Sequence, residues 1–146
     1  MNMKIAIIGY GTEGKAVAKY FAKKGAQITI CDEDENAKIP SKFKAKLGKK
    51  ALKGLKKYDA VFRSPGIHYK RVENLKNLTS LTEWFFQNCP CPIIGITGTK
   101  GKGTTSTLIY EILKTADYDA YLGGNIGTPP TEFFKKLTPQ SVVVLE

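Results

Sequence analysis

Two glycine-rich loops, each lying between an apolar run and a helical pattern, constrain the fold of this 146-residue chain more than any other feature. The first loop, "GYGTEG" at residues 9–14, follows "KIAII", and the second, "TGTKGKGTT" at residues 97–105, follows "PIIGI". Short apolar runs alternate with helical segments around both loops. This alternation favours an α/β fold with a parallel sheet, in which ligand sites lie at the carboxyl ends of the strands.

Local patterns predict two helices in the first half of the chain. After the first loop, Val17, Tyr20 and Phe21 share one helical face, and Gly25 is a residue type that commonly ends helices. Further on, Ser80 and Glu83 have the spacing of a capping box, which predicts a helix start.

The stretch 33–58 is rich in lysine and poorly patterned. It predicts a short strand near residues 43–47 and a helix near residues 50–57. The segment "NCPCP" contains two prolines and marks the predicted domain boundary. The expected domains are therefore 1–91 and 92–146.

The second domain repeats the strand–loop–helix order, and its helix carries a run of apolar residues. We expect this helix to direct four side chains inward: Leu108, Ile109, Ile112 and Leu113.

Composition excludes several classes of function. The net charge is +10, but only Arg63 and Arg71 among the 23 basic residues are arginines. Because reading of bases favours the guanidinium fork, the shortage of arginine weighs against a nucleic-acid partner, and a solvated lysine surface is favoured. No apolar run approaches the roughly 20 residues of a membrane helix, and the first residues enter a strand without a leader pattern. We expect a cytoplasmic protein without membrane insertion.

The three cysteines do not have the spacing of a metal site. Cys89 and Cys91 form C-P-C, and the chain has a single histidine. Reduced, structural cysteines are therefore expected.

The first loop has the spacing Gly9-x-Gly11-x-x-Gly14 and opens a helix, as a dinucleotide fingerprint requires. Asp32 ends the second predicted strand, where a ribose-binding acid would lie. These residues fit a Rossmann-like domain that binds NAD or FAD, a domain that binds another nucleotide, or a turn without a ligand. Glu13 places a carboxylate in the loop, which disfavours a diphosphate unless it points away.

The second loop is suited to phosphate. Backbone N–H groups of such a loop surround a phosphate, and Lys102 would add a cation. The strict pattern G-x-x-x-x-G-K-[ST] fails twice, because Ile96 replaces its first glycine and Gly103 replaces its hydroxyl residue. Thr104 and Thr105 follow and could supply an oxygen to Mg²⁺.

Together the motifs resemble one enzyme family. "TGTKGKGTT" resembles the ATP loop of the Mur ligase and folylpolyglutamate synthetase superfamily, in which T-G-T-x-G-K is typical. About 90 residues precede this loop and carry "IIGYGTEGKAVAKYFAKKG" and "DAVFRSPGI", while "GGNIGTP" and "VVVLE" follow it. This order is similar to the Mur ligases that add D-glutamate, and the similarity is weakest over 33–58.

The resemblance implies that the first loop holds the UDP part of a sugar nucleotide instead of NAD. The implied site for the UDP-muramoyl substrate consists of ten residues: Gly11, Thr12, Glu13 and Gly14 at the diphosphate, Asp32 and Glu33 at the uridine, Ser64, Pro65 and Gly66 beside the uracil, and Asn125 at the muramoyl group. Glu13 departs from the family, which usually has an uncharged residue there.

The resemblance also implies an ATP site with Lys102 as the catalytic cation and Mg²⁺ held by Thr104 and Glu146. The implied ATP-binding residues are Gly98, Thr99, Lys100, Gly101, Lys102, Gly103, Thr104 and Thr105. The implied reaction joins D-glutamate to UDP-N-acetylmuramoyl-L-alanine with ATP and Mg²⁺, through an acyl phosphate, in peptidoglycan synthesis.

The expected fold is a Rossmann-like domain followed by the truncated start of a P-loop ATP-binding α/β domain. Other parts of such a ligase have no counterpart in this sequence, so we expect the chain alone to be inactive. Two alternatives stay open: an NAD-binding dehydrogenase domain and a non-catalytic nucleotide-binding module.

Overall fold

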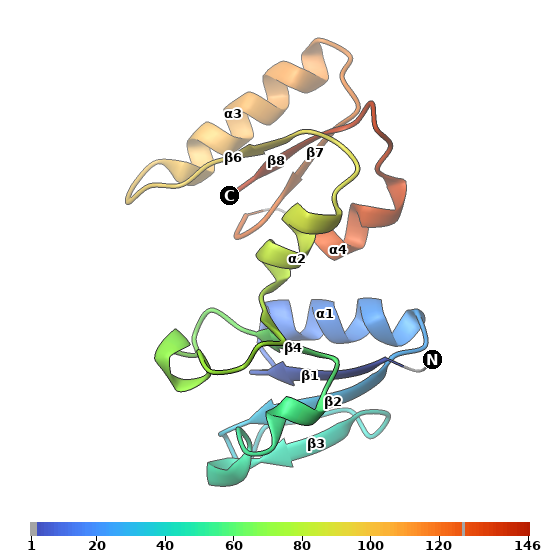
Figure 1. Ribbon diagram of the computed structural model, residues 1–146. Helices are drawn as coiled ribbons and strands as arrows, with labels where there is room; N and C mark the ends of the chain where they lie inside the picture. The colour runs from blue at the N-terminus through green and yellow to red at the C-terminus, as the bar shows by residue number, and fades with distance from the viewer. Residues whose placement is uncertain (1–2, 127) are drawn as a thin grey trace. The chain divides into compact units, whose positions relative to one another are not determined.

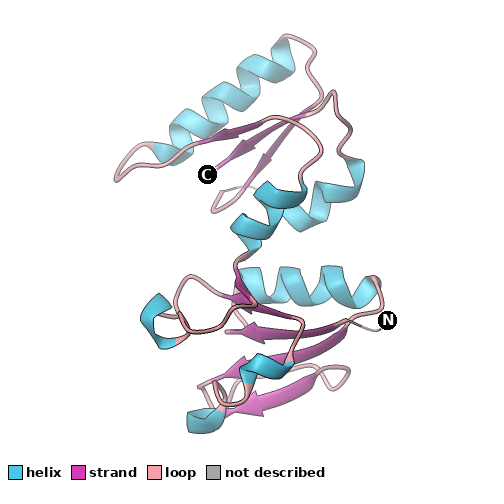
Figure 2. Ribbon diagram, in the orientation of Figure 1, coloured by secondary structure: helices cyan, strands magenta, loops and turns pink. Residues whose placement is uncertain are grey.

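The computed structural model describes residues 3–126 and 128–146, and its contacts divide the chain into two compact units, 1–84 and 85–146. Figure 1 labels the elements and Figure 2 colours them by type. The strands are β1 (Lys4–Ile8), β2 (Gln27–Asp32), β3 (Lys44–Leu47), β4 (Ala60–Arg63), β5 (Leu78–Thr79), β6 (Ile93–Gly95), β7 (Ala120–Gly123) and β8 (Val142–Leu145). The α-helices are α1 (Thr12–Lys23), α2 (Leu81–Asn88), α3 (Lys102–Thr115) and α4 (Pro130–Phe133). Short 3₁₀ turns are η1 (Gly48–Lys50), η2 (Leu55–Lys57), η3 (Tyr69–Arg71) and η4 (Phe134–Lys136).

The division between the units falls inside α2, earlier in the chain than the predicted boundary at 91/92. In the first unit, the Trp84 ring packs against Tyr20 and Phe21, with centroids 5.2 and 5.3 Å apart. In the second unit, Phe85 is fully buried and packs against Phe133 at 6.0 Å. Neighbouring aromatic residues of one helix thus belong to two different cores.

The sheet of the first unit has the strand order β3-β2-β1-β4-β5, and all its pairs are parallel. The chain therefore leaves β1 in one direction to form β2 and β3, and then returns to the other side to form β4 and β5. In such sheets the carboxyl ends on either side of the reversal form the ligand crevice. The predicted parallel α/β class is confirmed. The two-residue strand β5 was not predicted.

Helix α1 forms as its sequence pattern predicts. Val17, Tyr20 and Phe21 are all buried, and Phe21 packs against Phe62 of β4 with ring centroids 5.1 Å apart. Gly25 has φ +82°, and its N–H donates to the carbonyl of Ala22 at 3.0 Å. The left-handed conformation of Gly25 ends the helix, and this bond gives a partner to one of its last carbonyl groups, as in common C-terminal caps.

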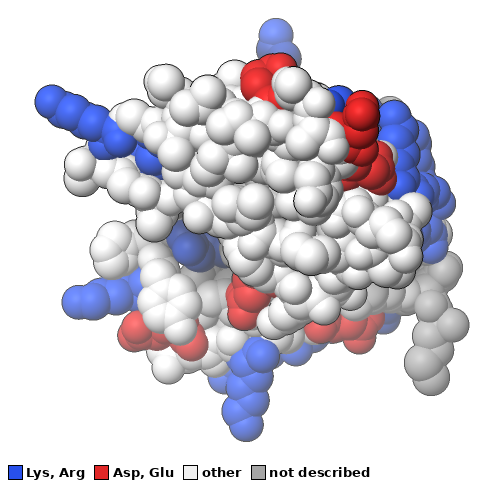
Figure 3. All heavy atoms as spheres, turned by 90° about the horizontal axis from the view of Figure 1, so that it is seen from above, with Lys and Arg blue, Asp and Glu red and all other residues white. Residues whose placement is uncertain are grey.

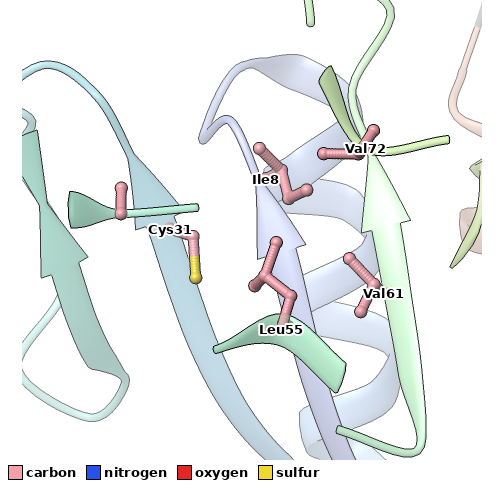
Figure 4. Packing of buried hydrophobic residues seen from close by; sticks show 7 residues of the cluster. Ile8, Cys31, Leu55, Val61 and Val72 are labelled. Carbon is pink, nitrogen blue, oxygen red and sulfur yellow. The ribbon is translucent and has the colours of Figure 1, made fainter. Parts of the chain in front are cut away.

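The opposite face of the sheet packs against loops and 3₁₀ turns. Figure 4 shows Ile8, Cys31, Leu55, Val61 and Val72 of this buried cluster, which also includes Ala6 and Ala51. Leu55 reaches the core from η2.

The prediction of a helix near residues 50–57 was wrong, because this segment forms only short turns. Gly54 has φ +67°, a left-handed conformation that interrupts a right-handed helix. The strand predicted near residues 43–47 is confirmed as β3. The predicted capping box is also confirmed: the N–H of Glu83 donates to the Ser80 hydroxyl at 3.0 Å, at the start of α2.

The second unit has a parallel three-stranded sheet in the order β6-β8-β7. Its central strand is buried at Val143, Val144 and Leu145. Two of the side chains expected to point inward from α3 do not: Leu108 is 60% exposed and Ile112 is 58% exposed. Helix α3 packs on β7 and β8, and the exposure of Leu108 and Ile112 shows that these two side chains are not buried in that contact.

Figure 3 shows the chain from above, and the atoms nearest the viewer belong mostly to uncharged residues, drawn in white. Among the helices of residues 3–126 and 128–146, none is long and apolar enough to cross a membrane.

Candidate functional site

The first glycine loop leaves β1 at the centre of the sheet and is fixed from both sides. The N–H of Gly9 donates to the carbonyl of Cys31 at 2.9 Å, and the Ser64 hydroxyl donates to the carbonyl of Gly9 at 3.1 Å. Gly9 has φ +87°, and a Cβ there would lie 3.0 Å from the Ser64 side chain. The loop therefore joins the ends of β1, β2 and β4.

The three glycines of the loop have different environments. A Cβ on Gly14 would overlap the carbonyl oxygen of Gly9, so only glycine allows α1 to start this close to β1. Gly11, in contrast, has nothing within 4 Å of its Cβ position and is exposed. Gly11 thus leaves open space beside the start of α1.

Gly11 is also the N-terminal cap of α1, and no side chain caps this end. The first N–H groups of a helix lack partners within the helix and attract anions. Thr12 is exposed next to these groups, so a phosphate could approach the backbone here. This geometry fits a diphosphate, but it does not by itself separate UDP from NAD.

Asp32 holds the first loop to the end of β2. One carboxylate oxygen accepts the N–H of Tyr10 at 2.9 Å, and the other accepts the N–H of Asp34 at 3.0 Å. Asp32, the predicted ribose-binding acid, therefore has a structural role in holding the loop. Each oxygen keeps a second acceptor site for a ligand hydroxyl.

Glu33, which the sequence placed at the uridine, lies exposed in an ion pair with Arg71. The two guanidinium nitrogens approach its two oxygens at 2.5 and 2.6 Å. The hydrogen bond from Arg71 lowers the pKa of Glu33 and raises the pKa of Arg71. The pair connects the loop after β2 with η3.

Glu13 and Arg63 border the same narrow crevice at the carboxyl ends of β1 and β4, together with Gly14 and Ser64. Burial raises the pKa of Glu13, and the positive charge of Arg63 offsets part of this effect. Arg63 also donates to the carbonyl of Ile67 at 2.6 Å, which fixes the turn of the predicted S-P-G segment.

Sequence reasoning did not select Arg63 as a site residue. Its place as the last residue of a buried strand, directly before Ser64, was the available signal. The other two residues of the S-P-G turn, Pro65 and Gly66, are exposed.

The second glycine loop leads from β6 into α3. Gly98 has φ +151° and Gly101 has φ +73°, conformations that favour glycine. Lys102 is the first residue of α3 and is half-buried, with its Cγ 3.9 Å from the Cβ position of Gly98. The lysine stem therefore runs along the loop, while Thr99 and Lys100 are exposed.

Thr104 and Thr105 do not cap α3. The cap position belongs to Gly101, without a side-chain hydrogen bond, and the two threonines lie exposed as the third and fourth residues of α3. Ser106 behind them is fully buried and donates to the carbonyl of Lys102 at 2.8 Å.

Glu146 lies at the carboxyl end of β8, beside the first turn of α3. Its Oε2 is buried and has no hydrogen-bond partner among the residues that the structure describes. That oxygen lies 3.6 Å from the Cβ position of Gly103, so the glycine leaves space between the helix and the carboxylate. A buried, unpartnered carboxylate oxygen is costly unless a cation or donor binds it. This environment fits the hard-oxygen chemistry of Mg²⁺.

The segment predicted to contact the muramoyl group also lies against Glu146. A Cβ on Gly124, which has φ +107°, would overlap the carbonyl oxygen of Glu146, and the N–H of Asn125 donates to this oxygen at 3.4 Å. The Asn125 side chain is exposed. Gly127 of the same motif lies outside the described residues.

Cys91 of the second unit has the character of a protonated thiol. The Sγ atoms of Cys89 and Cys91 lie 3.5 Å apart, and burial together with this contact raises the pKa of Cys91 to about 12. Thiols with raised pKa values are poor nucleophiles and metal ligands. Within residues 3–126 and 128–146, no three His, Cys, Asp or Glu side chains form a cluster for a metal ion.

Comparisons with known proteins agree with the motifs. Residues 3–80 match the family model described as "Mur ligase MurD-like, N-terminal domain". The "UDP-N-acetylmuramoylalanine–D-glutamate ligase" of Clostridium botulinum (strain Kyoto / Type A2) is 36% identical, and the alignment covers 98% of this chain and 34% of the relative. The protein with the same name from Acetivibrio thermocellus is 37% identical, with 99% and 34% covered. The chain thus spans about a third of the length of these relatives.

A solved structure of murein peptide ligase mpl from Psychrobacter arcticus 273-4 aligns with a TM-score of 0.46 and 19% identity, covering 99% of this chain and 37% of that one. The match of residues 3–80 spans more than half of the chain. On the strength of that match and of the sequence relatives, the chain belongs to the Mur ligases, as a MurD-like N-terminal portion.

Proposed function

We propose that this chain supplies the nucleotide-binding portion of an ATP-dependent ligase that adds D-glutamate to UDP-N-acetylmuramoyl-L-alanine. The first unit would bind the UDP part of the substrate at the first glycine loop. The second unit would form the start of a P-loop ATP-binding domain. The named relatives support this proposal, because they carry the name of that ligase.

The first unit offers a suitable UDP site. The diphosphate would meet the uncapped start of α1 beside Gly11, where no side chain fills the space. Asp32 would accept a hydroxyl of the ribose while it holds Tyr10 in place. Arg63 would offset the negative charge of Glu13 next to the diphosphate.

In the second unit, Lys102 would neutralise charge on the triphosphate during phosphoryl transfer. The substrate carboxylate would attack the γ-phosphoryl group to give an acyl phosphate, and the amine of D-glutamate would then displace phosphate. Thr104 and Glu146 would hold Mg²⁺, which would stabilise negative charge on phosphate oxygens when bound. The single observation that carries this part is the buried, unpartnered Oε2 of Glu146 beside Gly103.

Calorimetric titration of the chain with UDP-N-acetylmuramoyl-L-alanine, NAD and Mg·ATP tests the proposal. We expect saturable binding of the UDP ligand and none of NAD at the same concentrations. The chain alone should give no phosphate release from ATP with both substrates present. Tighter binding of NAD than of the UDP ligand would favour the dehydrogenase alternative. If a full-length relative binds the UDP ligand and this chain does not, the assignment of the site to the first unit is refuted.

A further inference from the structure

The first unit has a polar hollow at the amino ends of its strands, away from the glycine loop. It measures about 280 Å³ and is lined by Lys4, Gln27, Thr29, Lys44, Lys57 and Tyr58, which we call the lysine hollow. Small-molecule sites span roughly 300–1,000 Å³, so the hollow fits only a small ligand.

The strand register explains why these side chains gather. Lys4 pairs with Gln27 across β1 and β2, and Thr29 pairs with Lys44 across β2 and β3. Paired residues of a parallel sheet project to the same side, and residues two apart in a strand share a face. Two lysines and two neutral polar side chains from three neighbouring strands therefore face the same side of the sheet.

The hollow lies where the buried cluster of that face ends. Ala6 and Cys31, each two residues further along its strand than a hollow residue, belong to this cluster. Lys57 and Tyr58 reach the same side from the end of η2, where Leu55 covers the cluster. Lys57 Nζ lies 5.6 Å from the centroid of the Tyr58 ring.

The hollow carries a net positive charge. No Asp or Glu is among the described residues that line it. Asp59 adjoins it, and its Oδ2 accepts the backbone N–H of Lys4 at 2.6 Å, so one negative charge offsets part of the charge of the three lysines. Within the described part of the chain, none of the three lysines forms an ion pair. Three like charges around one small space repel one another, and a bound anion would relieve this repulsion.

We propose that the lysine hollow binds a small phosphate-bearing anion, such as inorganic pyrophosphate or a sugar phosphate. Ammonium groups bind phosphate as point charges, so three lysines suit a compact polyanion better than a planar carboxylate. Thr29, which is only 7% exposed, and the Gln27 amide add neutral donors at the wall. This site is separate from the first glycine loop, which lies at the carboxyl ends of the strands of the same sheet.

The test is a titration of the ¹⁵N-labelled chain with pyrophosphate at constant ionic strength, followed by amide chemical shifts. Residue-specific shifts separate the hollow from the glycine loops, which could also bind the probe. We expect saturable shifts at Gln27, Thr29 and Tyr58. A parallel titration with ribose 5-phosphate distinguishes free from esterified phosphate as the preferred ligand.

The decisive variant carries Lys4→Gln, Lys44→Gln and Lys57→Gln, which keep most of each stem and remove the charge. We expect it to weaken binding at the hollow by at least about tenfold, because hydrogen bonds to charged groups are among the stronger ones. The matched control carries Lys49→Gln, Lys50→Gln and Lys70→Gln, three exposed residues of η1 and η3.

The control variant should change the affinity less than about twofold, because its three lysines do not line the hollow and act on the ligand only through salt-screened, longer-range charge. All six lysines are exposed, so both variants should fold, and the single variant Lys44→Gln provides a milder test. Absence of saturable shifts at the hollow up to millimolar pyrophosphate would overturn the proposal. Equal weakening in both triple variants would also overturn it, because the effect would then come from net charge alone.

Discussion

The carboxylate of Asp32 accepts the backbone N–H of Tyr10 at 2.9 Å and so connects the end of β2 to the first glycine loop. Its second oxygen accepts the N–H of Asp34. The sequence predicts Asp32 as a ligand-binding acid, and the two hydrogen bonds give it a structural role as well.

We predict that Asp32→Ala lowers both the stability of the chain and its affinity for the UDP ligand. Loss of the two acceptors should reduce the free energy of unfolding by about 1–3 kcal/mol, and the loosened loop should also weaken binding of the UDP ligand. Chemical denaturation and calorimetry measure the two effects. Asp34→Ala is the matched control, because the Asp34 side chain accepts the N–H of Asn36 and lies outside the loop. Unchanged stability of Asp32→Ala would contradict the structural role.

Alanine substitution should affect different properties at two glycines of the first loop: stability at Gly14 and ligand affinity at Gly11. At Gly14 the added Cβ would overlap the carbonyl oxygen of Gly9, so Gly14→Ala should lower the melting temperature strongly, by several degrees or more. At Gly11 the Cβ meets only open space and φ is −75°, so Gly11→Ala should keep its stability and lose affinity for the UDP ligand. A Gly11→Ala variant with wild-type affinity would show that no ligand approaches this backbone.

The Glu13 carboxyl should make the first unit less stable at neutral pH. Burial raises the pKa of Glu13 in the folded chain above its ordinary value, so folding penalises the charged form. The penalty grows as pH rises through the range between the two pKa values and is absent below about pH 4. Glu13→Gln should therefore stabilise the chain at pH 7 and have little effect at acid pH.

The same Glu13→Gln substitution should strengthen binding of the UDP ligand at pH 7 by a few-fold, because it removes a negative charge next to the proposed diphosphate position. Melting curves and titrations at several pH values measure both effects. Stability gains that are equal at every pH would assign the effect to packing instead of charge.

Thr104 and Thr105 are neighbours on α3 with different expected roles. Neither caps the helix, so Thr104→Val and Thr105→Val should each change the free energy of unfolding by no more than about 0.5 kcal/mol. If Thr104 helps to hold Mg²⁺, only Thr104→Val should lower ATP affinity in the presence of Mg²⁺. ATP titrations with and without Mg²⁺ compare the two variants. Equal affinities for both variants and the wild type would remove Thr104 from the site.

The sequence predicted those parts of the fold that local chemistry determines. The buried face of α1 follows from the spacing of its apolar residues, and the start of α2 follows from the Ser80 hydroxyl. The exposure of Leu108 and Ile112 could not be predicted, because periodicity shows that a helix has an apolar face but not whether another element covers it.

The candidate site could likewise be predicted from the sequence only in part. Both glycine loops lie between a strand and a helix, as predicted, and Gly9, Gly98 and Gly101 have positive φ angles that favour glycine. The approach of Arg63 to Glu13 and the isolation of Glu146 Oε2 depend on which strands lie side by side, and residue spacing does not contain that information.

The measurement that tests the central claim most directly is amide chemical-shift mapping of the labelled chain with UDP-N-acetylmuramoyl-L-alanine. The proposed site predicts the largest saturable shifts at Gly11, Thr12 and Glu13, with further shifts at Asp32. The Gly11→Ala variant should lose them while it stays folded. Saturable shifts that spare the first glycine loop, or the same shifts with NAD at lower concentrations, would contradict the assignment of this loop to a UDP-muramoyl substrate.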